Sequence, residues 1–374
     1  MKKKKAKRKT SLFNKILLAV NIIMILLILV SYLSIYINPE KNWIMPIFGL
    51  IYPFLLIINL LFLIYWIILR KYFFLFSLAA ILIGWFHVGK YIQFRSSSET
   101  LGSSSSFKIS SYNVKNLAND NVHIDNPEIR QKIIQYLQED NPDILCLQEF
   151  YSPGPKPLML LDSLSKLLKM PYYEYARYSR HEGGRFDAIV TFSKFPIIKK
   201  EGINSDEDHQ YGLLTDIEFQ GKSFRLFNIH LESFRFKNRD YEFLTDIELP
   251  KNKEDNFRRG SAEILRKMRA AFTTRAVQVK NMRELMEKSP NPVVVCGDFN
   301  DTPLSYSYYI LSHNLTDAFL ESGSGISNTY SGKLPSYRID YIFYDPKIIS
   351  EGYLRTKVDY SDHYPISCYL MFKE

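Results

Sequence analysis

An aspartate and a histidine in the last part of the chain could form a pair for acid–base chemistry. Asp340 lies inside the apolar run RIDYIFYD, where an unpaired carboxylate is very costly to bury, so it needs a cationic or hydrogen-bonding partner. His363, in SDHYP, is a candidate partner. A buried carboxylate beside a histidine fixes the imidazole tautomer and raises its basicity, as hydrolytic sites require. Alone, the pair is weak evidence for a catalytic site.

A second candidate follows the run PVVVCGDFNDTP. The three valines and the cysteine predict a buried strand, and Gly297 permits a close approach of the backbone. Asp298 and Asn300 then emerge two residues apart. This pattern fits a site at the end of a strand, but an ordinary Asx turn would show it too.

Three more polar residues sit in or at the end of apolar runs. Asn113 ends FKISSYNV, Glu149 ends DILCLQEF, and His230 shares one face of the strand SFRLFNIHLES with Asn228. Burying a polar group on such a face costs folding free energy unless the group is hydrogen-bonded or takes part in a functional site. Glu149 could instead be a solvated strand terminus, and His230 a hydrogen-bonded core histidine.

The elements that must position these residues are several short strands and a few amphipathic helices. Each polar residue falls at the end of, or within, a separate apolar strand, and a helix is predicted over Pro127–Asp140 from its apolar spacing. No ordinary core requires all of these polar groups together. About 268 residues are ample for a single large α/β unit.

In this order the motifs SYNVKNL, LCLQEF, FNIHLES, VVCGDFNDTP, RIDYIFYD and SDHYP resemble the endonuclease/exonuclease/phosphatase superfamily of DNase-I-like hydrolases. The resemblance covers Phe107 to about Lys373. It implies a four-layer α/β sandwich, with two packed β-sheets flanked by helices, in which strand ends from both sheets form the site. It also implies hydrolysis of phosphate esters.

The same resemblance implies a divalent cation, Mg²⁺ or Mn²⁺. Glu149 would be its main ligand, since such ions take few carboxylates besides water and substrate phosphate. Asn113 would lie beside the ion and contact the substrate. Asp362 would be a second ligand or act through water. Whether one or two ions bind stays open.

The resemblance further implies the roles of the remaining site residues. His230 and Asn300 would donate hydrogen bonds to the nonbridging phosphate oxygens, where negative charge grows in the transition state. Asp298 would orient the attacking water. His363, held by Asp340, would serve as general acid or base, and either Asp298 or His363 would take the proton of the water.

One long segment departs from the compact members of that superfamily. Glu232–Ala271 is a charged stretch of roughly forty residues after the predicted histidine strand. It could be a lid that faces the substrate or a solvated insertion.

The charge of the chain separates an N-terminal part from the rest. The formal net charge is +9, but residues 1–95 carry 13 Lys and Arg against a single acid, Glu40. The remaining 279 residues therefore carry a charge of −3. This balance excludes a basic nucleic-acid-coating domain for the bulk of the chain.

Residues 1–95 also hold three long apolar runs, predicted as a three-helix transmembrane segment over about 16–37, 44–69 and 72–92. A cleaved signal peptide would have a shorter apolar run and a small-residue cleavage site. The serine-rich residues 96–106 are predicted as a flexible linker, and residues 107–374 as the catalytic domain.

The basic tail KKKKAKRK predicts a cytoplasmic N-terminus in a bacterial inner or plasma membrane. Three spans would then place the catalytic domain outside the cytoplasm, whereas a re-entrant third segment would return it to the cytoplasmic side. The expected substrates are phosphate esters near a bilayer: a lipid headgroup, an inositol phosphate or a nucleic acid. The alternatives are an extracytoplasmic nuclease and a non-catalytic membrane scaffold, and no obligate protein partner is inferred.

Overall fold

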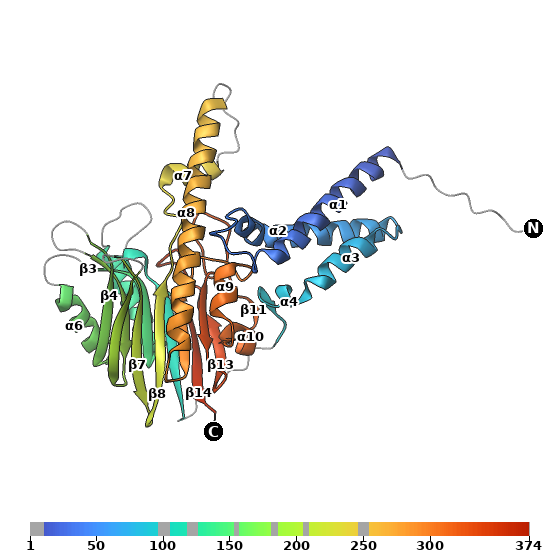
Figure 1. The fold of residues 1–374 in the computed structure, drawn as a ribbon. Helices are drawn as coiled ribbons and strands as arrows, with labels where there is room; N and C mark the ends of the chain where they lie inside the picture. Colours follow the sequence, from blue (N-terminus) through green and yellow to red (C-terminus); the bar gives the residue numbers. More distant parts are fainter. Residues whose placement is uncertain are drawn as a thin grey trace, which may run out of the picture. The chain divides into compact units, whose positions relative to one another are not determined.

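The computed structural model describes residues 11–95, 105–117, 126–152, 157–180, 186–204, 209–245 and 254–373. The chain divides into two compact units (Figure 1). The first comprises Met1–Val88 with Leu304–Tyr306, and the second comprises Gly89–Pro303 with Ser307–Glu374. We call them the helical unit and the catalytic unit.

The helical unit contains α1 (Leu12–Leu33), α2 (Met45–Ile68), α3 (Phe74–Ile83) and α4 (Trp85–Val88). Of these, α1 and α2 are long and apolar enough to cross a membrane. The third predicted span, over 72–92, does not form one continuous helix, and α3 is a shorter apolar helix. The run breaks at Gly84, and the residues after α4 belong to the catalytic unit.

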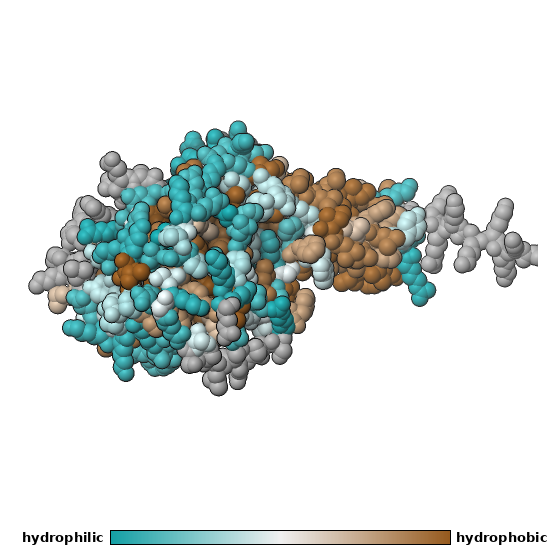
Figure 2. Space-filling view, turned by 60° about the horizontal axis from the view of Figure 1, so that its bottom comes forward, coloured by the Kyte–Doolittle hydropathy of each residue, from teal (hydrophilic) through white to brown (hydrophobic). Residues whose placement is uncertain are grey.

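Apolar side chains cover the outside of the helical unit. Figure 2 shows hydrophobic residues gathered there, in contrast to the mostly hydrophilic surface over the β-sheets. Along α1 and α2 many large apolar side chains are about half exposed, among them Ile23, Leu26, Ile57, Leu61 and Ile64. A water-soluble helical bundle would bury such a surface.

Polar side chains occupy the inside of the same unit. The amide of Asn21 on α1 donates to Ser77 Oγ on α3 at 2.8 Å and accepts from Trp66 Nε1 on α2 at 2.9 Å. Asn59 Nδ2 donates to the backbone oxygen of Met24 at 3.1 Å. Polar residues that join helices inside an apolar shell are typical of membrane helices.

The catalytic unit is built on two six-stranded mixed β-sheets. The first has the order β13-β14-β2-β3-β5-β4, and the second β10-β12-β9-β8-β7-β6. The strands of the first sheet are β2 (Ser106–Asn113), β3 (Ile144–Ser152), β4 (Tyr172–Arg180), β5 (Phe186–Ser193), β13 (Ile348–Arg355) and β14 (Ile366–Phe372). Those of the second are β6 (Ile197–Asn204), β7 (Gln210–Phe219), β8 (Lys222–His230), β9 (Val293–Asp298), β10 (Thr316–Asp317) and β12 (Asp340–Tyr344).

Helices cover the outer faces, as Figure 1 shows for α6 and α8. The catalytic unit has the helices η1 (Lys115–Leu117), α5 (Pro127–Asp140), α6 (Pro157–Leu167), α7 (Asn238–Thr245), α8 (Glu254–Glu287), α9 (Tyr306–Leu311) and α10 (Ala318–Ser322). One apolar core joins the facing sides of the sheets, and a second packs α5 and α6 against the first sheet. The predicted four-layer α/β sandwich is confirmed.

A short strand precedes the serine-rich segment and belongs to the catalytic unit. β1 (Ile92–Gln93) pairs with β11 (Gly325–Ile326). The buried Arg338 donates from Nη1 to the backbone oxygen of Lys90 at 2.9 Å. Residues 96–104 of the predicted linker lie outside the described residues.

Candidate active site

Three of the predicted residues form one row across the second sheet. His230 ends β8 and stands opposite Asp298 on the parallel strand β9. Asp340 begins β12 and stands opposite the same Asp298 on the antiparallel side. Because β8 and β9 are parallel, their carboxyl ends open at one edge, and all three side chains are buried there. Gly297 makes this pairing possible, since a Cβ there would lie 2.0 Å from the oxygen of Ile229.

The first sheet contributes Asn113 and Glu149 from its own parallel pair. Asn113 ends β2 opposite Gln148 of β3. The register of β3 shifts between Leu147 and Phe150, and Glu149 has φ +49°. A non-glycine residue in this left-handed region is strained, and such residues concentrate at functional sites. The β-bulge changes the direction of the Glu149 side chain relative to its neighbours in the strand.

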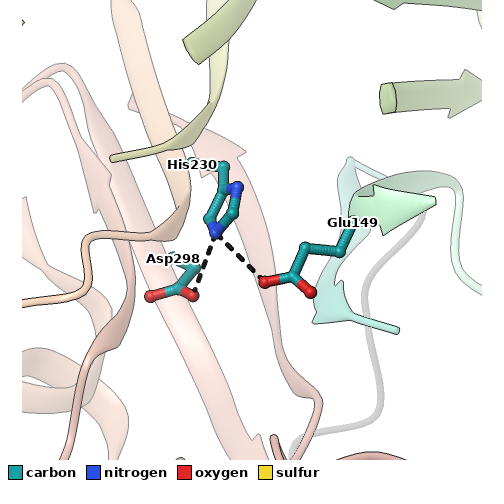
Figure 3. A group of neighbouring side chains, drawn as sticks. All are labelled: Glu149, His230 and Asp298. Atoms are coloured by element: carbon teal, nitrogen blue, oxygen red, sulfur yellow. Dashed lines mark ion pairs between the residues drawn. The ribbon is translucent and has the colours of Figure 1, made fainter. Parts of the chain in front are cut away.

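Side chains from the two sheets meet around His230 (Figure 3). The Nε2 atom of His230 lies 3.3 Å from Glu149 Oε1 and 3.6 Å from Asp298 Oδ2. The Nδ2 atom of Asn113 donates hydrogen bonds to the same two carboxylates, to Glu149 Oε1 at 3.1 Å and to Asp298 Oδ2 at 3.0 Å. The structure thus brings four predicted residues from separate strands into one group.

Asn300 holds the turn that carries Asp298. Its backbone N–H donates to Asp298 Oδ1 at 2.7 Å, and its Nδ2 donates to Asp298 Oδ2 at 3.2 Å and to the backbone oxygen of Leu231 at 2.9 Å. Asn300 has φ +52°. The turn is therefore an Asx turn, as one reading of the sequence allowed, and it also belongs to the site.

The predicted pair of Asp340 and His363 is present. His363 Nδ1 lies 2.9 Å from Asp340 Oδ2, and its Nε2 lies 3.7 Å from Asp298 Oδ2. Both residues of the pair are buried. When Nδ1 of His363 carries the proton and donates to Asp340, Nε2 of the same ring faces Asp298 in the centre of the site.

The charges of the group shift one another's protonation. Burial opposes the charge of Glu149, but hydrogen bonding and attraction from His230, with the amide of Asn113, lower its pKa to about 2. Burial raises the pKa of Asp298 to about 6, with Asp340 adding to the rise and the two histidines opposing it. Burial disfavours the charged form of His363, yet Asp340 and Asp298 together raise its pKa above the ordinary value. Groups with shifted pKa values in one cluster are typical of catalytic sites.

Asp362 lies outside this group. Its Oδ2 is 2.8 Å from Nζ of Lys115, which lies two residues after the end of β2. Two sets of three possible metal ligands occur among the described residues: Glu149, His230 and Asp298, and Asp298, Asp340 and His363. Asp362 is in neither.

Sequence reasoning missed three side chains at this end of the molecule. The ring of Tyr178 on β4 lies 4.7 Å from the ring of His230. Arg235 pairs with Glu232 at 2.6 Å. The buried Arg275 on α8 donates to the backbone oxygen of Glu232 at 2.7 Å. None of the three ends an apolar strand, so their positions in the sequence carry no signal.

Comparison with known proteins agrees with this geometry. Residues 110–363 match the model of the Endonuclease/Exonuclease/phosphatase family. The chain belongs to that family. Its members hydrolyse phosphoester bonds and depend on divalent metal ions, and this chain is accordingly a phosphoester hydrolase. Residues 14–91 match a domain of unknown function (DUF8431), and no curated protein matches the chain.

Solved structures show the same fold. An endonuclease/exonuclease/phosphatase from Beutenbergia cavernae DSM 12333 has 18% identity and a TM-score of 0.51, covering 72% of each chain. A family protein from Leptotrichia buccalis C-1013-b has 14% identity and a TM-score of 0.50, covering 71% of this chain and all of that one. The human Nocturnin catalytic domain with bound sulfate has 18% identity and a TM-score of 0.50, covering 72% of this chain and 94% of that one.

Proposed function

We propose that this chain is a membrane-anchored, divalent-metal-dependent phosphodiesterase. The observation that carries the proposal is the convergence of Asn113 and Glu149 from one sheet with His230 and Asp298 from the other. The two carboxylates at this spacing can hold a divalent cation, and the amide and imidazole can donate hydrogen bonds to a phosphate group beside it. The sulfate in the Nocturnin catalytic domain is a tetrahedral anion like phosphate, and it supports an anion-binding role for this fold.

The donors fit a hard cation such as Mg²⁺ or Mn²⁺. Glu149 supplies the carboxylate oxygens that such an ion prefers. The role of Asn113 as a ligand stays a prediction, because its Oδ1 accepts from the backbone N–H of Lys115 at 3.0 Å. The low pKa of Glu149 keeps its carboxylate ionised at neutral pH. A cation held there would neutralise charge on the phosphoryl group during in-line attack. The role of Asp362 as a second ligand stays a prediction, because Lys115 occupies its carboxylate in this structure.

The other residues divide the work of proton transfer and charge stabilisation. His230 and Asn300 would donate hydrogen bonds to nonbridging oxygens of the phosphate. Asp298, held by two donors of Asn300, would orient the attacking water. His363 would transfer a proton at Nε2 while Asp340 holds Nδ1.

The anchor in this proposal is the helical unit. Its outward apolar side chains and inward hydrogen-bonded polar groups are the arrangement that a bilayer stabilises. The basic tail favours a cytoplasmic N-terminus. Two spans return the chain to that side, whereas a crossing by α3 and α4 would place the catalytic unit outside, as the sequence predicted. Protease digestion of intact and permeabilised cells separates the two topologies.

The test of the reaction class uses the full-length chain in detergent micelles with Mg²⁺. A generic aryl phosphodiester, DNA, a lysophospholipid and inositol phosphates are incubated with the wild type and with His363→Ala. We expect hydrolysis of at least one phosphodiester by the wild type and a loss of at least 100-fold in the variant. A wild type that is inert on every substrate would leave the scaffold alternative, and cleavage of DNA alone would favour the nuclease alternative.

A further inference from the structure

The segment after His230 carries a cation next to the active site that the reaction roles above do not use. Arg235 lies in the charged segment that follows β8, and its side chain is 58% exposed. Among the described residues its carboxylate partner is Glu232, which meets Nε at 2.6 Å and Nη2 at 3.1 Å. A guanidinium held along one edge keeps its remaining N–H groups available to a ligand.

Two hydrogen bonds fix the backbone of Glu232, the residue whose carboxylate holds this guanidinium. The backbone oxygen of Glu232 accepts from Arg275, and its N–H donates to Gln278 Oε1 at 3.0 Å. Arg235 itself has φ +50°, a strained conformation for a residue with a long side chain. The position of Arg235 is therefore defined by residues of the fold, although its side chain is largely exposed.

Tyr178 connects Arg235 to the catalytic group. Its hydroxyl is a hydrogen-bond partner of Arg235, and its ring lies 4.7 Å from the ring of His230. Burial raises the pKa of Tyr178, the charges of Glu232 and Glu149 add to the rise, and Arg235 opposes it. Tyr178 thus lies between Arg235 and the ring of His230, which is predicted to contact the phosphate.

We propose that Arg235 and Tyr178 form a subsite for a second phosphate group of the substrate. An exposed, oriented guanidinium is suited to bidentate recognition of a phosphate. The favoured substrate would be a phosphodiester whose uncleaved part carries a further phosphate, either a nucleotide or a phosphorylated lipid headgroup. This inference rests on the proposed phosphodiesterase activity.

The experiment compares matched substrates on the full-length chain in micelles with Mg²⁺. One pair is thymidine 5′-(4-nitrophenyl phosphate) with and without a 3′-phosphate, and the other is glycerophosphoinositol with and without a 4-phosphate. We expect kcat/KM to be about tenfold higher for the phosphorylated member of one pair, mainly through KM. The preferred pair distinguishes the nucleotide from the headgroup.

Variants assign the preference to the subsite. In Arg235→Ala the ratio of the two kcat/KM values should fall to about one. Arg235→Lys, which keeps the charge, and Tyr178→Phe, which keeps the ring on His230, should give intermediate ratios. Arg239→Ala is the matched control, because Arg239 is 63% exposed in the same segment and pairs with Glu263.

Two outcomes overturn the inference. One is hydrolysis of both members of each pair at equal rates by the wild type. The other is a preference that persists in Arg235→Ala, which would leave Arg235 only its structural pair with Glu232. Hydrolysis of no substrate by the wild type would instead overturn the proposed function, and the subsite with it.

Discussion

Replacing Asp340 by asparagine should slow the reaction without disturbing the fold. Asparagine has nearly the same shape but no charge, so it removes the ionic part of the 2.9 Å contact with His363 Nδ1. A hydrogen bond to a charged group contributes about 1.5–3 kcal/mol. At about 1.36 kcal/mol per factor of ten, kcat should fall about 10- to 150-fold.

The direction follows from the charges around His363. Asp340 and Asp298 both stabilise its protonated form, so loss of the Asp340 charge lowers the pKa of His363 and weakens its hold on the proton. The asparagine amide can also turn its NH₂ group toward Nδ1 and favour the wrong tautomer. Both effects act on proton transfer rather than on substrate binding, so KM should change little.

The assay is steady-state hydrolysis of an aryl phosphodiester by the full-length chain in micelles. Asp345→Asn is the control, because Asp345 accepts from the backbone N–H of Lys347 in a turn and touches no site residue. The thermal midpoints of both variants show whether the fold is intact. If kcat of Asp340→Asn stays within twofold of the wild type while His363→Ala is inactive, the orienting role of Asp340 is refuted.

Three further substitutions test the framework around the site. Arg275→Met should destabilise the chain by about 3 kcal/mol, since it leaves the buried carboxylate of Asp301, 3.3 Å from Nε, without its cation. Adding Asp301→Asn should recover part of that loss in a denaturation assay, and no recovery would contradict the pairing. Gly297→Ala should cost at least about 1–3 kcal/mol, because φ is +132° and the new methyl group meets the backbone of Ile229; an unchanged thermal midpoint would speak against this close approach. Asn21→Leu should weaken the helical unit in detergent by about 1 kcal/mol through loss of two interhelical hydrogen bonds, measured as resistance to SDS unfolding, and a variant as resistant as the wild type would show that these bonds add no stability.

Much of the site could be predicted because its residues interrupt apolar strands. Asn113, Glu149, Asp298 and Asp340 each stand where burial of a polar group must be compensated, and strand ends are easy to locate from composition. Asn228 and His230 show the limit of this reasoning. Both lie on one face of β8, but Asn228 is a core residue that accepts from Gln148 at 2.7 Å and donates to the oxygen of Val190 at 2.9 Å.

The remaining features depend on contacts between distant parts of the chain. Composition favoured a third span, but it does not show that Gly84 packs against the ring of Tyr32 and breaks the helix. The salt bridge of Lys115 with Asp362 joins residues far apart in sequence, and so does the ring contact of Tyr178 with His230. The first pair depends on β2 and β14 being neighbours in the first sheet, and the second on the packing of the two sheets.

The central claim is that phosphodiester hydrolysis depends on a divalent cation held by Glu149. The most direct test measures hydrolysis by the full-length chain in micelles after EDTA treatment and during titration with Mg²⁺, for the wild type and for Glu149→Gln. We predict that EDTA abolishes the wild-type activity, that Mg²⁺ restores it, and that Glu149→Gln stays at least 100-fold slower at saturating Mg²⁺. Activity that survives EDTA, or a variant as fast as the wild type, would contradict the claim.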